Sequence, residues 1–150
     1  MQPLAKGPFP LPFKGKGEES WRSPVLRQRL EEAQRNCREI ELAMQMLIDE
    51  FEQTFSTPLT AYLTLHRTGR GLYLRWRMAG SRQSYFSLAS NETGQTFYGS
   101  LSPAVRQVVF DFEQRRLRLN LLHGLVLHES RSLQRFMVKM RATQQLRNNT

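Results

Sequence analysis

The 150-residue sequence contains a single cysteine, Cys37, and no long apolar run. One cysteine cannot close a disulfide within the chain, which fits a reducing cytoplasm and a buried free thiol. No stretch approaches the roughly 20 apolar residues that a membrane-spanning helix needs, and the first residues lack the apolar core of a signal peptide. We therefore expect a cytoplasmic protein with no membrane association.

Residues that carry catalysis or bind metals are also scarce. Of the three histidines, His123 and His128 are five positions apart, a poorer spacing for a metal than four, and no cysteine or carboxylate completes a set. The Gly-Lys pattern at residues 14–17 lacks the longer glycine-rich run ending in Gly-Lys-Ser/Thr that binds nucleotide phosphates. We expect no enzymatic activity, no metal and no cofactor.

Acidic residues are few outside one segment. The sequence has 22 Lys and Arg against 13 Asp and Glu, a net charge of +9. Residues 57–101 contain five basic groups and one acidic group, and residues 102–150 contain nine basic and three acidic groups. Only residues 23–56 are net acidic, with four basic and seven acidic groups. Eighteen of the basic residues are arginines, which bind phosphate in a bidentate manner. This balance favours a polyanionic partner.

Prolines crowd the start of the chain and are sparse afterwards. Pro3, Pro8, Pro10 and Pro12 exclude a regular helix there, so we predict an N-terminal arm at residues 1–22 that is either extended or disordered. Residues 23–146 then form one domain, followed by a short tail at 147–150.

Apolar residues between Leu26 and Phe51 recur at steps of four and three. Such a heptad pattern predicts a long helix with one narrow apolar stripe. Ser23-Pro24 provides a cap and a first-turn proline, and Pro58 follows the expected end near Thr54. The stripe comprises Leu26, Leu30, Ala33, Cys37, Ile40, Met44, Leu47 and Phe51.

Ser102-Pro103 begins a second long helix by the same device, and we expect it to end near Gln145. One heptad frame runs through it, with Arg115 and Glu129 as misses. A second apolar stripe, containing Val109, Leu117, Leu121 and Leu125, predicts cover on two sides, and Gly124 predicts either a close crossing or a kink. Two helices leave part of such stripes uncovered, so we expect a homodimer through the helices.

Between the helices the apolar period changes to two, which predicts strands. Thr68-Gly69-Arg70-Gly71 and residues 80–83 are turns, and a short third strand covers residues 85–88. Residues 90–101 are polar and are expected to form a connecting loop. The fold class is therefore α+β: two long antiparallel helices with an inserted three-stranded antiparallel β-meander. Its apolar face, which should pack on the helices, comprises Leu63, Leu65, Leu72, Leu74, Trp76, Phe86 and Leu88.

The opposite face of this meander interleaves arginine with tyrosine, together with Tyr62 and His66. Arginine reaches phosphates and guanine edges, and tyrosine stacks or donates to phosphate. The alternative is an ordinary solvated face. The candidate nucleic-acid-binding residues, two of them in the turns, are Arg70, Tyr73, Arg75, Arg77, Arg82 and Tyr85.

A second basic group lies on the later helix, where it either tracks a phosphate backbone or is solvated against the acidic first helix. It comprises Arg115, Arg116, Arg118, Arg131, Arg135, Lys139 and Arg141.

Three segments, 12–17, 74–77 and 116–123, resemble a family of small proteins of unknown function carried by bacterial integrative and conjugative elements and sometimes described as integrase regulators. The resemblance implies a role in DNA traffic and supplies no catalytic residues. The pattern from Leu72 to Leu88 is also similar to the three-stranded arm-type DNA-binding sheets of tyrosine recombinases, although a recombinase catalytic domain is lacking.

These observations predict a non-enzymatic DNA-binding accessory or regulatory protein of a mobile genetic element. An alternative from another class is an interaction or scaffold module whose helical hairpin binds a protein of the integration or conjugation machinery.

Overall fold

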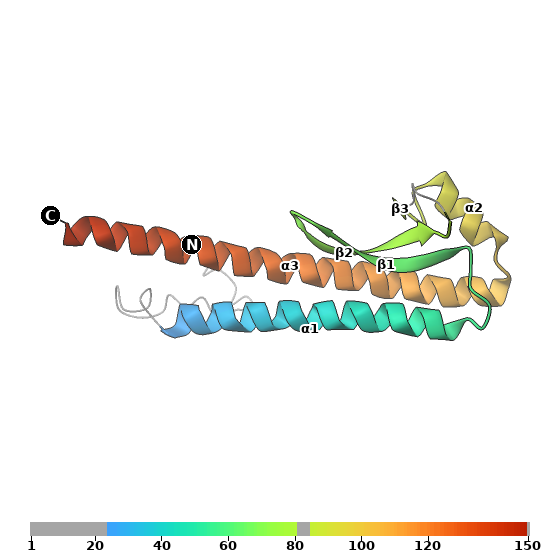
Figure 1. Cartoon of the computed structure of the whole chain (residues 1–150), viewed down its shortest axis with the longest axis horizontal. Helices are drawn as coiled ribbons and strands as arrows, with labels where there is room; N and C mark the ends of the chain where they lie inside the picture. Colours follow the sequence, from blue (N-terminus) through green and yellow to red (C-terminus); the bar gives the residue numbers. More distant parts are fainter. Residues whose placement is uncertain (1–23, 81–84, 150) are drawn as a thin grey trace, which may run out of the picture.

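The computed structural model describes residues 24–80 and 85–149. The elements follow in the order α1 (Pro24–Thr54), β1 (Ala61–Thr68), β2 (Gly71–Met78), β3 (Tyr85–Phe86), α2 (Glu92–Ser100) and α3 (Pro103–Asn148). Helices α1 and α3 run antiparallel, and the strands form one antiparallel sheet of order β1-β2-β3 packed along them (Figure 1). The predicted fold class, two long antiparallel helices with an inserted three-stranded meander, is confirmed. The arm predicted at 1–22 and the capping Ser23 lie outside the described residues.

Helix α1 begins at Pro24 and ends at Thr54, as the sequence predicts. Its heptad stripe faces the interior: Leu26, Ala33, Met44, Leu47 and Phe51 are buried, and the other stripe residues are half-buried. Within the described residues, no helix combines the length and apolar character needed to cross a bilayer.

Strands β1 and β2 pair from Ala61 opposite Met78 to Thr68 opposite Gly71. The alternation predicted for the sheet is confirmed, because the apolar residues of β1 and β2 point to the helices while Tyr73, Arg75 and Arg77 lie on the other face. Glycine is favoured at the start of β2 and two residues beyond its end, where Gly71 has φ +152° and Gly80 has φ +74°.

Strand β3 ends earlier than predicted, and among the described residues it comprises Tyr85 and Phe86. Its register pairs Trp76 with Phe86, so a longer strand would bring Leu88 opposite Leu74. Asn120 of α3 occupies that place, because its side chain accepts a hydrogen bond from the Leu74 N–H (2.8 Å) and donates one to the Leu74 carbonyl (3.0 Å). The helix therefore replaces the end of the third strand.

The connecting loop expected at residues 90–101 is instead the short helix α2. The side chain of Asn91 caps it by accepting a hydrogen bond from the Thr93 N–H (3.0 Å). Gly94 lets the helix approach the chain after β3, since a Cβ there would lie 2.1 Å from the Ser87 carbonyl oxygen. Phe97 then reaches the core.

Helix α3 starts at Pro103, capped by the Ser102 side chain, and continues to Asn148, past the predicted end near Gln145 and into the predicted tail. Within this chain, the cover predicted for the two apolar stripes of α3 is only partly present. Val109 is fully buried, whereas the rest of the second stripe, Leu117, Leu121 and Leu125, is exposed. A Cβ on Gly124 would meet nothing within 4 Å, so the predicted close crossing there is wrong.

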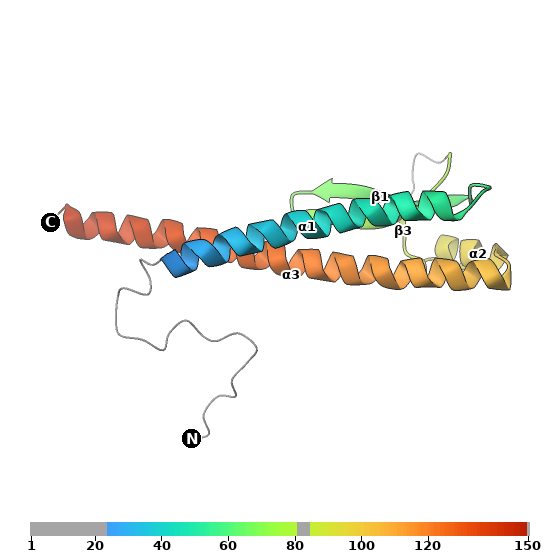
Figure 2. The same ribbon diagram turned by 90° about the horizontal axis from the view of Figure 1, so that it is seen from below.

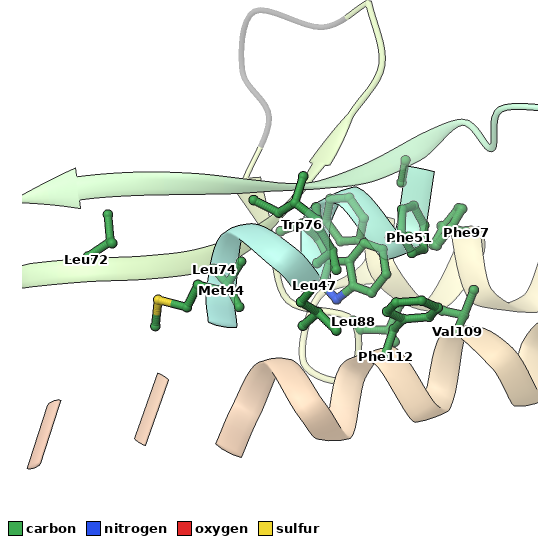
Figure 3. Close-up of a cluster of buried hydrophobic side chains, with 14 residues drawn as sticks. Met44, Leu47, Phe51, Leu72, Leu74, Trp76, Leu88, Phe97, Val109 and Phe112 are labelled. Carbon is green, nitrogen blue, oxygen red and sulfur yellow. The ribbon is translucent and has the colours of Figure 1, made fainter. Parts of the chain in front are cut away.

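The core lies where α1, α3 and the sheet meet, and Figure 3 shows Trp76 at its centre among side chains from both helices. Phe51 packs edge-on against Trp76 (ring centroids 5.4 Å apart) and against Phe112 (5.1 Å). Phe97 of α2 contacts Trp76 and Phe86. Burying each of these large side chains contributes on the order of 2 kcal/mol, so the sheet is held firmly on the hairpin.

Candidate nucleic-acid interface

A polar seam between β2 and α3 fixes the sheet on the helices. The Trp76 indole donates to Glu113 Oε2 (2.7 Å), and Arg116 donates to both oxygens of the same carboxylate (2.7 and 2.9 Å). Arg116 also donates to the Leu74 carbonyl (3.0 Å), beside Asn120. A buried carboxylate with three such hydrogen bonds avoids the large cost of an unpaired buried charge. Trp76 and Leu74 are thereby held with the opposite face of β2 turned away from the helices.

Several residues of this seam belong to the segments that carry the family resemblance. Leu74 and Trp76 come from segment 74–77, and Arg116 and Asn120 come from segment 116–123. In the structure they bind one another and hold the sheet, so their role is structural. The neighbouring residues Arg75 and Arg77 point the other way.

The outward face of the sheet brings together the tyrosines and arginines that the sequence predicts for it. The register places Tyr62 opposite Arg77, His66 opposite Tyr73, and Arg77 opposite Tyr85. Three of the candidate residues meet here in direct contact. The Cζ of Arg75 lies 5.6 Å from the ring centroid of Tyr73 and 5.3 Å from that of Tyr85.

Two further side chains complete this outward cluster. The Cζ of Arg77 lies 5.9 Å from the Tyr85 ring centroid. His66 also stacks on the Tyr85 ring, with centroids 4.6 Å apart and planes inclined by 22°. Each cation–π contact at a partly exposed site contributes about 0.5–1 kcal/mol. The contacts fix the orientation of the guanidinium groups, which therefore need little reordering to meet a ligand.

The charged side chains of the three strands are all basic. The sequence contains no aspartate or glutamate between Glu52 and Glu92, so none of the three strands contributes a carboxylate. The third arginine of the strands, Arg67, lies at the helix side of the sheet, where it is 3.8 Å from Glu41. The outward face therefore derives its charge from Arg75 and Arg77.

The hairpin turn extends the basic surface towards α3. Arg70 is exposed in this turn, and Arg131 donates to its carbonyl oxygen (3.3 Å) and to that of Gly69 (3.5 Å). The backbone N–H of Arg70 is bound by the Thr68 hydroxyl (3.1 Å). Arg70 thus lies beside Arg131 at the end of the hairpin. Arg82, the remaining candidate, lies outside the described residues.

The second basic group predicted on α3 is divided by the structure. Arg115 binds Glu50 of α1 (Nη1 to Oε1, 2.8 Å), and Arg116 belongs to the polar seam. For Arg115 the alternative interpretation, a basic side chain against the acidic first helix, is confirmed. Arg118, Arg135, Lys139 and Arg141 are exposed.

The buried histidine of α3 lies beside a carboxylate of α1. His123 is buried and its Nε2 is 3.2 Å from Glu41 Oε1. Sequence reasoning treated it as a core or surface residue and did not find its partner, because the two are 82 positions apart. Among residues 24–80 and 85–149, no three His, Cys, Asp or Glu side chains gather in a metal-binding arrangement.

Comparison with known proteins returned no match among family models, curated proteins or solved structures. The interpretation of the outward face therefore rests on its own geometry, an arginine held between two tyrosines on a sheet surface whose strands carry no acidic residue.

Proposed function

We propose that this chain is a non-enzymatic DNA-binding accessory or regulatory protein that contacts the duplex with the outward face of its sheet. The observation that supports the proposal is the Tyr73–Arg75–Tyr85 cluster, with Arg77 beside it. Arginine is the residue that most often contacts guanine in the major groove, and a narrow β-ribbon fits a groove about 12 Å wide. The resemblance to proteins of integrative and conjugative elements suggests that this DNA belongs to a mobile element.

The chemistry of the face separates two tasks. Arg75 and Arg77 supply charge for phosphate or base edges, while Tyr73, Tyr85 and His66 supply flat surfaces and polar tips next to them. Arg70 and Arg131 at the hairpin end would add phosphate contacts. Binding that depends on several phosphates releases counterions and weakens steeply with salt.

The test is duplex binding at several salt concentrations with the full chain and the double variant Arg75→Ala/Arg77→Ala. We expect binding to weaken in the variant by about tenfold or more, and the salt slope to fall by roughly two, since about one counterion is released for each phosphate contact. A matched control, Arg35→Ala/Arg38→Ala, removes two exposed arginines from α1 and should weaken duplex binding much less. Equal losses in both variants, or no duplex binding at low salt, would contradict the proposal.

A second candidate is an interaction or scaffold module that uses the helical hairpin. Leu117, Leu121 and Leu125 favour it, because three leucines at steps of four are exposed along one side of α3. This function predicts that a protein partner still binds after the Arg75→Ala/Arg77→Ala change and no longer binds after Leu121→Glu. Comparing these two variants therefore separates the candidates.

A further inference from the structure

A shallow, open groove of about 430 Å³ lies along α1, and Arg115 of α3 borders it. Its lining comes from these two helices, with no contribution from the sheet; seen from below in Figure 2, α1 and α3 lie in front of the strands. Its lining residues are Ala43, Met46, Leu47, Asp49, Glu50, Gln53 and Arg115.

On each helix a row of residues with helical spacing extends the groove, and we call these two rows its walls; Arg115 is the member of the α3 row that lines the groove itself. On α1 the wall follows Glu39, Ala43, Met46 and Glu50 at steps of four, three and four. On α3 it follows Arg115, Arg118, Leu122 and Leu125 at steps of three, four and three. Three apolar side chains in these walls are largely exposed, Met46 at 61%, Leu122 at 47% and Leu125 at 59%. Adjacent exposed apolar side chains on neighbouring helices indicate an interaction surface.

The two walls carry opposite charges. The α1 wall contains Glu39 and Glu50, with Asp49 also in the groove, whereas the charged residues of the α3 wall are Arg115 and Arg118. Within one chain the walls are already joined by the Glu50–Arg115 ion pair. The surface is therefore complementary to itself when one copy is turned so that its acidic wall meets the basic wall of another.

Two symmetric pairings could bring two such faces together. A two-fold axis parallel to the helices places α1 on α3 of the second copy, acid on base, at both contacts. An axis across the helices places α1 on α1 and α3 on α3, so that like charges meet twice, which costs several kcal/mol. We propose that a second copy of this chain occupies the groove in the first arrangement and forms a four-helix bundle.

The available surface is large enough for such a dimer. Helix α1 has 31 residues, and a hairpin face of that length measures roughly 45 Å by 20 Å from helix dimensions. That is about 900 Å² for each partner, close to the roughly 800 Å² of a stable interface.

This pairing places the two sheets on opposite outer faces of the bundle, because in each copy the sheet and the groove lie on opposite sides of the hairpin. From the usual spacing of packed layers, the sheets would be roughly 30 Å apart. In combination with the proposed function, on which this step rests, one dimer holds two duplexes and bridges them instead of reading adjacent half-sites of one duplex.

The molar mass of the full chain in sedimentation tests the pairing. We expect a dimer for the unmodified protein. The dimer dissociation constant should rise by about tenfold or more for Met46→Arg, which places a positive charge against the basic wall, and for Leu122→Glu, which places a negative charge against the acidic wall. Val138→Arg is the matched control, since Val138 is equally exposed (64%) but lies beyond the groove, and it should stay dimeric. A monomeric unmodified protein would overturn the pairing and leave the groove to a different protein.

Mixing the two disruptive variants tests the arrangement itself. In the α1-on-α3 pairing, the arginine introduced by Met46→Arg in one copy lies about one helical turn from the glutamate introduced by Leu122→Glu in the other, close enough for the two long side chains to pair. The remaining contact is unmodified, so the mixture should recover the dimer. In the alternative pairing the introduced arginine meets the acidic α1 wall and the introduced glutamate meets the basic α3 wall of the other copy, so each variant alone should stay dimeric. The second result would overturn the proposed arrangement.

Capture of a labelled duplex by an immobilised duplex, through the protein, tests the bridging step. We expect capture with the unmodified protein and with Val138→Arg, and its loss with Met46→Arg even though that variant still binds single duplexes. A dimer that binds DNA without capturing a second duplex would overturn the opposed placement of the sheets. Failure to bind any duplex would instead refute the proposed function, and the mass measurement would still decide the pairing.

Discussion

Asn120 shows how one amide side chain can take the place of a strand residue. Its oxygen and nitrogen bind the N–H and the carbonyl of Leu74, as a peptide group of a neighbouring strand would. Arg116 supplies a second donor to the same carbonyl. No local pattern predicts this pairing, since the partners are 46 positions apart and Asn120 interrupts no apolar pattern.

Replacing Asn120 with leucine should destabilise the protein by about 1–3 kcal/mol, because the Leu74 N–H then loses its partner in a half-buried place while its carbonyl keeps Arg116. Urea unfolding measures the change. Gln114→Leu, at an exposed position of the same helix, serves as the control. Its free energy of unfolding should stay within about 0.5 kcal/mol of that of the unmodified protein. Equal stability of the two variants would show that the amide is dispensable.

The Glu50–Arg115 pair offers a second residue-level prediction. The hydrogen bonds from Arg115 hold the pKa of Glu50 below its usual value, and those to Glu50 hold the pKa of Arg115 above its own. A carboxyl whose pKa is lowered by folding stabilises the protein above its unfolded pKa, and this contribution is lost as the pH falls through the lowered folded value. Both side chains are exposed, so the effect on stability is small.

The pKa itself is therefore the better observable. We expect the Arg115→Gln change to raise the pKa of Glu50 towards that of an ordinary glutamate, measured by carbon NMR of the side-chain carboxyl during an acid titration. An unchanged titration of Glu50 in the variant would show that the ion pair does not persist in solution.

Among the elements, those with a clear period were predictable and those set by distant contacts were not. The heptad residues of α1 and the alternation of β2 locate both elements and assign their faces, including the outward Tyr73, Arg75 and Arg77. The contacts within that face, such as His66 on Tyr85, depend on where β3 lies, which no local pattern gives. The length of β3 depends on Asn120. The sequence of α2 is polar and has no apolar period, and its buried residues are Gly94 and Phe97.

Two glycines of α2 give a matched prediction. Gly94→Ala should cost more than about 2 kcal/mol or unfold this corner, because its Cβ would meet the backbone of Ser87 and Leu88, which cannot easily move. Gly99→Ala places a methyl group in open space and should be neutral or stabilise the helix by up to about 1 kcal/mol. Thermal unfolding of both variants checks the pair, and similar losses would refute the close approach at Gly94.

At the scale of the whole molecule, the sheet and α2 cover one end of a long hairpin (Figure 1), and the main cluster of buried side chains lies there. The aromatic core joins α1, α2, α3 and the sheet, whereas Ser130 is the last buried residue of α3 before the helix continues to Asn148. Stability should therefore fall along α3 from its start to its end.

Hydrogen exchange can measure this gradient. Amides of α3 between Val109 and His123 should exchange through global unfolding, while those after Ser130 should exchange orders of magnitude faster through local opening. Dimer formation through the groove would slow exchange in the middle of α1 without changing the end of α3. Uniform protection along α3 would contradict the prediction.

The seal that Asn120 and Arg116 place on β2 also bears on aggregation. An open strand edge is a template on which another chain can add a strand, and repeated addition leads to fibres. Beyond Trp76, the edge of β2 that faces away from β1 is closed by helix side chains, so no foreign strand can bind at Leu74. Loss of this amide would therefore expose a growth site for cross-β assembly next to the apolar residues of the core.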